Sequence, residues 1–170
     1  MRAVNVGGAK LPMADLRELA AGLGATEVST FIASGNLICV PPGEPSAFDR
    51  ALERAVEERF GFFREAISRT PQELAAALAG FPFERTTPKF SYLHVLLAAP
   101  TPEAAAAFNA TDFGADRAQV IGDVAYLSYA EGAGASKLTA AVLARRLGVQ
   151  GTARNLDTVA KLVELASQDG

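Results

Sequence analysis

The stretch Phe-Ser-Tyr-Leu-His-Val-Leu-Leu-Ala at positions 90–98 decides the fold, because its apolar and aromatic residues predict a strong β-strand. Turn and cap residues divide the chain that follows. Gly122-Asp123 is a two-residue hairpin signal, and Gly148 is the kind of residue that ends a helix. The expected elements are a helix from Thr101-Pro102 to Phe108, strands Ala118–Ile121 and Val124–Tyr129, a helix from Ser136 or Lys137 to Leu147, a strand Gly151–Leu156, and a helix Thr158–Ala166 capped by Asp157.

The first half of the chain carries the same order of elements. The turn Ser34-Gly35-Asn36 separates two β-rich segments, and Gly61 ends a long apolar-periodic helix. The expected elements are a strand Arg2–Val6, a helix Pro12–Leu23, strands Glu27–Ala33 and Leu37–Val40, a helix Ala47–Phe60 capped by Ser46, a strand Phe63–Ser68, and a helix from Thr70-Pro71 to Leu78.

Matching landmarks indicate a repeat. Gly122 follows Gly35, and Gly148 follows Gly61, by the same 87 positions. We therefore expect an α+β fold that is a tandem duplication of ferredoxin-like βαββαβ units, each followed by a helix. The predicted domain organisation is a first subdomain at 1–79, a connector at 80–89 and a second subdomain at 90–170.

Bulk properties limit the function. The chain has 170 residues, a net charge of −3 and a single cysteine, Cys39. The net charge argues against a surface built for nucleic acid, and one cysteine excludes an intramolecular disulfide. We find neither a signal peptide nor an apolar run long enough to span a membrane, so we expect a cytoplasmic protein.

Several motifs are specific, and they occur in order along nearly the whole chain: Asn5-Val6-Gly7-Gly8, Lys10-Leu11-Pro12-Met13, Phe31-Ile32-Ala33-Ser34-Gly35-Asn36, Ser136-Lys137-Leu138 and residues 152–162. In these motifs the chain resembles the bacterial domain-of-unknown-function 1697 family. The resemblance implies a tandem ferredoxin-like fold and no particular activity. The chain departs from the family's pattern at Leu156, where members often have tryptophan, and at its start, where members carry several more residues. We expect an upstream extension to stabilise the first strand.

Two polar loops of the first half are predicted to share one edge of the sheet. Gly7 and Gly8, with Lys10 close by, follow a strand and precede a helix, an arrangement that suits an anion although no phosphate-loop motif is present. A tight turn explains the same glycines. Because strands one and two of a βαββαβ unit are parallel, Asn5 to Gly8 should lie beside Ser34 and Asn36.

The second half has a basic stretch. From Gly132 to Leu156 there are four basic residues and no acidic one: Lys137, Arg145, Arg146 and Arg154. Arg145 and Arg146 suit the last turn of a helix, whereas Lys137 and Arg154 indicate either an anion site or surface ion pairs.

Other chemistry has weak support. His94 and Cys39 have apolar neighbours and are expected in the core, so neither a catalytic triad nor a zinc site is predicted. The acidic residues between Asp49 and Glu58 are expected on a solvated helix face. An RNA-binding face needs aromatic residues on central strands, and Arg2–Val6 and Leu37–Val40 contain none.

Two hypotheses remain. The first is a binding site, with or without catalysis, for an anionic small molecule near the junction of the halves. The second is a non-enzymatic module that uses a sheet face or edge to bind protein or RNA. The residues predicted for the first are Asn5, Gly7, Gly8, Lys10, Ser34, Asn36, Lys137, Arg154, Asn155 and Lys161. The sequence identifies no catalytic residue, metal ligand, cofactor or oligomeric state.

Overall fold

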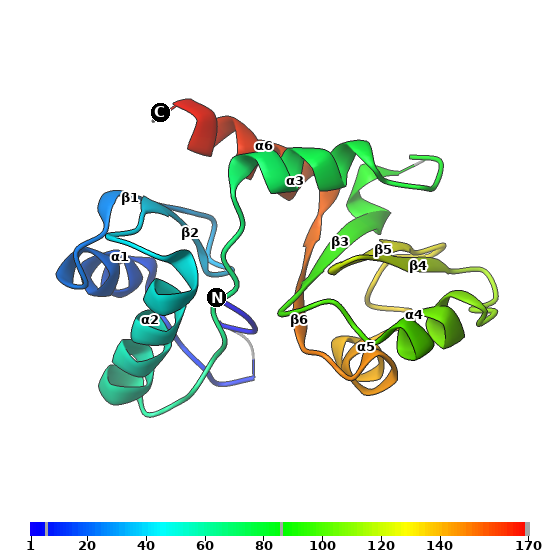
Figure 1. The fold of residues 1–170 in the computed structure, drawn as a ribbon, viewed down its shortest axis with the longest axis horizontal. Coiled ribbons are helices and arrows are strands. Elements are labelled where there is room, and N and C mark those ends of the chain that lie inside the picture. Colours follow the sequence, from blue (N-terminus) through cyan, green and yellow to red (C-terminus); the bar gives the residue numbers. More distant parts are fainter. Residues whose placement is uncertain (6, 86, 169–170) are drawn as a thin grey trace. The chain divides into compact units, whose positions relative to one another are not determined.

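The computed structural model describes residues 1–5, 7–85 and 87–168. The structure contains helices and two antiparallel sheets, so the predicted α+β class is confirmed (Figure 1). The chain divides into two compact units, one of residues 1–70 and 164–170, the other of residues 71–163. The boundaries predicted from the sequence, 1–79, 80–89 and 90–170, stay a prediction.

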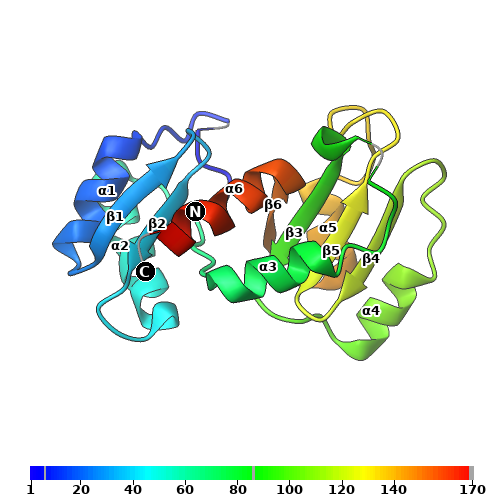
Figure 2. The ribbon, with the colours of Figure 1, turned by 90° about the horizontal axis from the view of Figure 1, so that it is seen from above.

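The second unit is built around a four-stranded antiparallel sheet with strand order β4-β5-β3-β6 (Figure 2). Chain order and strand order together are those of a ferredoxin-like βαββαβ unit. Its elements are α3 (Pro71–Ala79), η1 (Pro88–Phe90), β3 (Ser91–Leu96), α4 (Pro102–Asn109), β4 (Arg117–Ile121), β5 (Val124–Ser128), α5 (Ala140–Leu147) and β6 (Gly151–Asn155), followed by α6 (Leu156–Gln168), which continues into the residues grouped with the first unit.

Helices cover both faces of this sheet, because alternate strand residues point to opposite faces and both sets are apolar. On one face Phe108 of α4 and Leu143 of α5 pack against strand residues such as Leu96 and Leu127. On the other face α3 and α6 cover Leu93, Val124 and Tyr126. Figure 1 shows the sheet lying between these two helix pairs.

The first unit has a hairpin of two strands instead of a four-stranded sheet. Its elements are α1 (Met13–Gly22), β1 (Thr26–Phe31), β2 (Asn36–Val40) and α2 (Pro45–Phe60). Leu16 of α1 and Leu52 and Val56 of α2 pack against the hairpin side chains Val28 and Leu37. The hairpin lies where the sequence predicted it, but the duplication as a whole is not confirmed and stays a prediction.

The predicted strand Arg2–Val6 is wrong for residues 2–5, and Val6 lies outside the described residues. Ala3 and Asn5 have φ values of +47° and +58°, which an extended strand does not allow. A hydrogen bond from Asn5 N to Ala9 O (2.7 Å) closes a turn in this segment instead.

The predicted strand Phe63–Ser68 is also absent from the described structure. Backbone N–H groups of this segment bond to side chains of α2 instead of to a neighbouring strand. Ala66 N donates to Glu53 Oε1 (2.8 Å), and Ser68 N donates to Asp49 Oδ2 (2.9 Å). The two carboxylates are 3% and 7% exposed, so the prediction that the acids of this helix are solvated is wrong for both.

Three helix starts also differ from prediction. Helix α2 begins with Pro45 after Glu44, so Ser46 is not its cap. Helix α5 begins at Ala140, because Thr139 Oγ1 accepts a hydrogen bond from Val142 N (3.3 Å) and caps it. Helix α6 begins at Leu156, one residue before the predicted cap Asp157.

Candidate functional site

Asn5 fastens two loops of the first unit together. Its amide nitrogen donates to Leu11 O (3.0 Å) and Ala33 O (2.6 Å), while Leu11 N donates to its oxygen (2.8 Å). Asn5 therefore lies beside the hairpin turn, as the sequence predicted for it. All three contacts of the amide are with the backbone, so Asn5 holds these two loops in place.

The turn residues Ser34 and Asn36 also bond to the hairpin itself. Asn36 is 8% exposed, and its amide nitrogen donates to Phe31 O (3.1 Å) and to Ser34 Oγ (3.0 Å). Gly35 has a φ of +79°, and a Cβ there would lie 2.5 Å from Val4 Cγ2. The turn and the N-terminal segment thus pack closely, and only glycine fits between them.

Gly7, Gly8 and Lys10 lie on the solvent side of this loop. All three are exposed, and a hydrogen bond from Lys10 N to Gly8 O (3.0 Å) tightens the loop. Among the residues that the structure describes, the Lys10 ammonium has no acidic partner within 4 Å.

In the second unit, Arg154 lies along its own strand. One guanidinium nitrogen donates to Thr152 Oγ1 (2.7 Å) and Ala153 O (2.8 Å), and burial lowers the pKa of the guanidinium. Asn155 Oδ1 accepts a hydrogen bond from Thr158 N (2.8 Å), so Asn155 caps α6. Lys161 is half-buried on the same helix. These contacts place Arg154 and Asn155 in structural roles.

Residues 132–137 form a loop between β5 and α5, which we call the glycine–lysine loop. Asp116 anchors both ends, since one carboxylate oxygen accepts from Ala130 N (2.9 Å) and the other from Ser136 Oγ (2.6 Å). Ala135 N donates to Gly132 O (3.2 Å) within the loop. These hydrogen bonds join the loop and the residues beside it to Asp116.

Tyr129 packs next to the glycine–lysine loop. It is 7% exposed, its ring lies 5.4 Å from that of Tyr92, and its hydroxyl donates to Leu138 O (3.3 Å). Burial, with Tyr92 and Asp116 nearby, raises the pKa of Tyr129 to about 12. Tyr129 is therefore neutral near pH 7 and is a packing residue.

The glycine–lysine loop contains backbone donors and one cation that no hydrogen bond or ion pair of the described residues uses. Within the described part of the chain, the N–H groups of Ala133, Gly134, Ser136 and Lys137 have no acceptor, and the Lys137 ammonium has no acidic partner. Lys137 is exposed. Sequence reasoning found Lys137 but missed these amides, although the glycine spacing of Gly132-Ala133-Gly134 was a signal.

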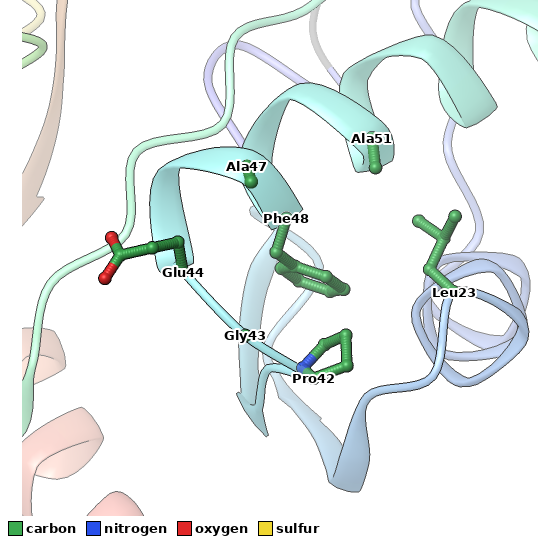
Figure 3. Close-up of a pocket in the computed structure, with 7 residues that line it drawn as sticks. All are labelled: Leu23, Pro42, Gly43, Glu44, Ala47, Phe48 and Ala51. Carbon is green, nitrogen blue, oxygen red and sulfur yellow. The ribbon is translucent and has the colours of Figure 1, made fainter.

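A hollow in the first unit, away from these loops, is apolar. It has a volume of about 230 Å³ and is lined by Leu23, Pro42, Gly43, Glu44, Ala47, Phe48 and Ala51. Figure 3 shows the Glu44 carboxylate pointing away from Phe48 and Pro42. None of the ten predicted residues lines the hollow, and its carbon-rich walls do not suit an anion.

The single histidine and the single cysteine are packing residues. His94 is 1% exposed, and Cys39 is half-buried against the first unit's core, where burial and Asp49 raise the pKa of its thiol. No group of three His, Cys, Asp or Glu side chains that could hold a metal ion occurs in residues 1–5, 7–85 and 87–168. No helix in that part of the chain is both long and apolar enough to cross a membrane.

Comparison with known proteins gives a family and a fold. The sequence model of a family described as "Protein of unknown function (DUF1697)" matches residues 1–126. The chain is similar to the solved structure of the conserved bacterial protein SP0830 from Streptococcus pneumoniae, with a TM-score of 0.72 and 18% identity over 98% of this chain and 94% of that one. At that identity the likeness establishes the fold alone. A search of curated proteins finds no match.

Proposed function

Since the chain belongs to the DUF1697 family, whose description assigns no activity, its function has to be argued from its own residues, and we propose that it binds a small molecule bearing a phosphate or carboxylate group. The proposed position is the glycine–lysine loop of the second unit. The proposal concerns binding, and no reaction is attributed to the loop.

The observation that carries the proposal is the set of backbone N–H groups without acceptors beside Lys137. Successive N–H groups in a loop make a concave site for an anion, and a lysine adds a charge that a phosphate or carboxylate neutralises. The hydroxyl of Ser136 is bonded to Asp116, so it fixes the loop while the amides stay available to a ligand.

The loop of Gly7, Gly8 and Lys10 is a second position of the same kind in the first unit. There too the polar side chain, Asn5, holds the loop, while the glycines and the lysine face solvent. The side chains of Asn5, Ser34, Asn36 and Asn155 take part in hydrogen bonds within the chain and are left out of the ligand contacts in this proposal.

The alternative, an interaction module that uses a sheet face, has less support. In the second unit Leu93 is 0% exposed, Val124 8% and Tyr126 5%, because α3 and α6 cover that face. RNA bases stack on exposed aromatic side chains of strands. Helices α3 and α6 would therefore have to move away from the sheet before this face could bind RNA.

The test is a titration of the full chain with inorganic phosphate and pyrophosphate, followed by two-dimensional amide NMR. We expect chemical-shift changes centred on Ala133, Gly134 and Lys137. Lys137→Met should weaken binding about 10- to 100-fold, since a hydrogen bond to a charged group contributes about 1.5–3 kcal/mol. Arg54→Met is the control, because Arg54 is an exposed cation on α2 and lies outside both loops.

Equal affinities of Lys137→Met and Arg54→Met would refute the proposal for this loop. Lys10→Met measures the first-unit loop separately. If Lys10→Met alone weakens binding, the site belongs to the first unit. Shift changes spread over all exposed lysines would mean nonspecific attraction of the anion.

A further inference from the structure

The strand β4 forms one edge of the second unit's sheet, with β5 as its only strand neighbour among the described residues. Ile121 pairs with Val124 next to the two-residue turn Gly122-Asp123. In an antiparallel pair, backbone groups point alternately toward and away from the partner strand. The N–H and C=O groups of Val120 and Ala118 therefore point outward, where a further strand would bind.

A side-chain amide occupies the outward position at Val120. Val120 N donates to Asn109 Oδ1 (2.8 Å), and Asn109 Nδ2 donates to Val120 O (2.9 Å). These two hydrogen bonds are the pair that a residue of a neighbouring strand would make. Asn109 thus takes the place of a strand partner at the middle of the edge.

Neighbouring contacts hold Asn109 at the end of α4. Phe108, the preceding residue, is 1% exposed and lies in the core against Phe113, with ring centroids 5.0 Å apart. Arg146 of α5 donates to Thr111 Oγ1 (3.1 Å), which fixes the chain just after the helix. The amide is therefore positioned by the packing of two helices.

The sequence of β4 suits pairing with a second copy of itself. In an antiparallel pair centred on Gln119, Arg117 would face Ile121 of the other copy, so no like charges would stand directly opposite. Ile121 is 49% exposed and would gain apolar contact there. An open edge of this kind is a template for strand pairing.

We propose that Asn109 blocks the β4 edge and keeps a second copy of this chain from pairing with it. The excluded partner is the antiparallel β4 of another molecule. The blocking residue acts by occupying both outward groups of Val120, and its removal opens the edge from Ala118 to Val120.

The test compares self-association of Asn109→Ala with that of the wild-type chain by sedimentation equilibrium. We expect at least a tenfold fall in the dissociation constant for self-association, together with slower hydrogen exchange at Ala118 in the associated form. Glu103→Ala is the matched control, because Glu103 is exposed on the same helix and far along it from the edge. It should associate as the wild-type chain does.

A second substitution locates the contact. Ala118→Pro removes the outward N–H that the new strand pair needs, so Asn109→Ala with Ala118→Pro should return to wild-type association. Association that persists in the double variant would overturn the proposal, as would wild-type association of Asn109→Ala. If Asn109→Ala does not fold, Asn109→Ser, whose shorter side chain cannot make both hydrogen bonds to Val120, is judged by the same criteria.

Discussion

Replacing Gly151 by alanine tests how closely β6 packs on β3. A Cβ at this position would lie 2.5 Å from His94 Nε2, 2.7 Å from His94 Cδ2 and 2.7 Å from Val95 O. Ordinary contacts of a Cβ begin at 3.4 Å, so the histidine ring would have to move by about 0.9 Å. His94 is 1% exposed and the third neighbour is backbone, so neither can yield easily.

Overpacking of this kind costs about 1–3 kcal/mol, and we expect the upper end of that range for Gly151→Ala. For a unit of this size the thermal midpoint should fall by roughly 10–20 °C. The chain has no tryptophan, so the unfolding measurement is a urea melt followed by far-UV circular dichroism. The expected result is a lower midpoint with an unchanged slope.

Gly134→Ala is the control in the same unit. Nothing lies within 4 Å of a Cβ there, and its backbone is outside the left-handed region. This substitution should change stability by less than about 1 kcal/mol, and in the stabilising direction, since it restricts the unfolded chain. If Gly151→Ala and Gly134→Ala unfold at the same midpoint, the close packing of β6 on His94 is refuted.

Three further predictions concern other parts of the chain. Glu53→Ala should destabilise the first unit by about 2–4 kcal/mol and speed hydrogen exchange at Ala66, whose N–H it leaves buried without its acceptor. Gly35→Ala should cost about 2–4 kcal/mol in a urea melt, because it combines a φ of +79° with a contact of 2.5 Å to Val4. The pKa of Tyr129, about 12 when folded against 10.0 normally, predicts that stability present below pH 10 is lost between pH 10 and 12, on the order of 2–3 kcal/mol by urea melts.

Each of these has a contrary outcome. Unchanged exchange at Ala66 would show that Glu53 is not its acceptor in solution. A wild-type midpoint for Gly35→Ala would mean that the turn and the N-terminal segment do not pack as described. For Tyr129, the Tyr129→Phe variant should lose most of the alkaline dependence, and equal dependence in both proteins would assign it to other groups.

The hairpins and most helices could be predicted from the sequence because their signals are local. The turn glycines Gly35 and Gly122 separate segments of β-forming residues, and both lie in the hairpins expected for them. The apolar spacing in Met13–Gly22 gave α1 within about one residue. Neither prediction needed knowledge of contacts with distant residues.

The predicted strands failed at residues 2–5 and 63–68 for a non-local reason. Both segments have strand-like composition, but in each of them hydrogen bonds run between a side chain and backbone groups of residues elsewhere in the chain. Asn5 bonds to Leu11 and Ala33, and Glu53 and Asp49 bond to residues 66–68. A carboxylate on a helix looks solvated in a sequence, because the pattern does not show which chain segment will pack over it.

The predictions for the candidate site show the same difference between local signals and non-local contacts. The sequence drew attention to the glycines and lysines of two loops, since glycine and lysine signal turns and charge by themselves, and their role in binding stays a prediction. It also selected Asn36, Arg154 and Asn155, whose polar groups bond to nearby backbone or side-chain atoms. Polar residue types are equally suited to ligands and to backbone groups, and only the fold decides between these uses.

The sequence by itself determined the α+β class, the order of most elements and the location of the exposed lysines, because these follow from periodicity, turn residues and charge. The tertiary structure decided which backbone groups are hydrogen-bonded and which side chains are their partners. Asn109 reaches Val120 only because Phe108 anchors α4 against the sheet, and Asp116 fixes the glycine–lysine loop only because Ala130 and Ser136 come within reach of its carboxylate. Hydrogen bonds between residues far apart in the chain depend on the packing that brings them together, and that packing is a property of the whole unit.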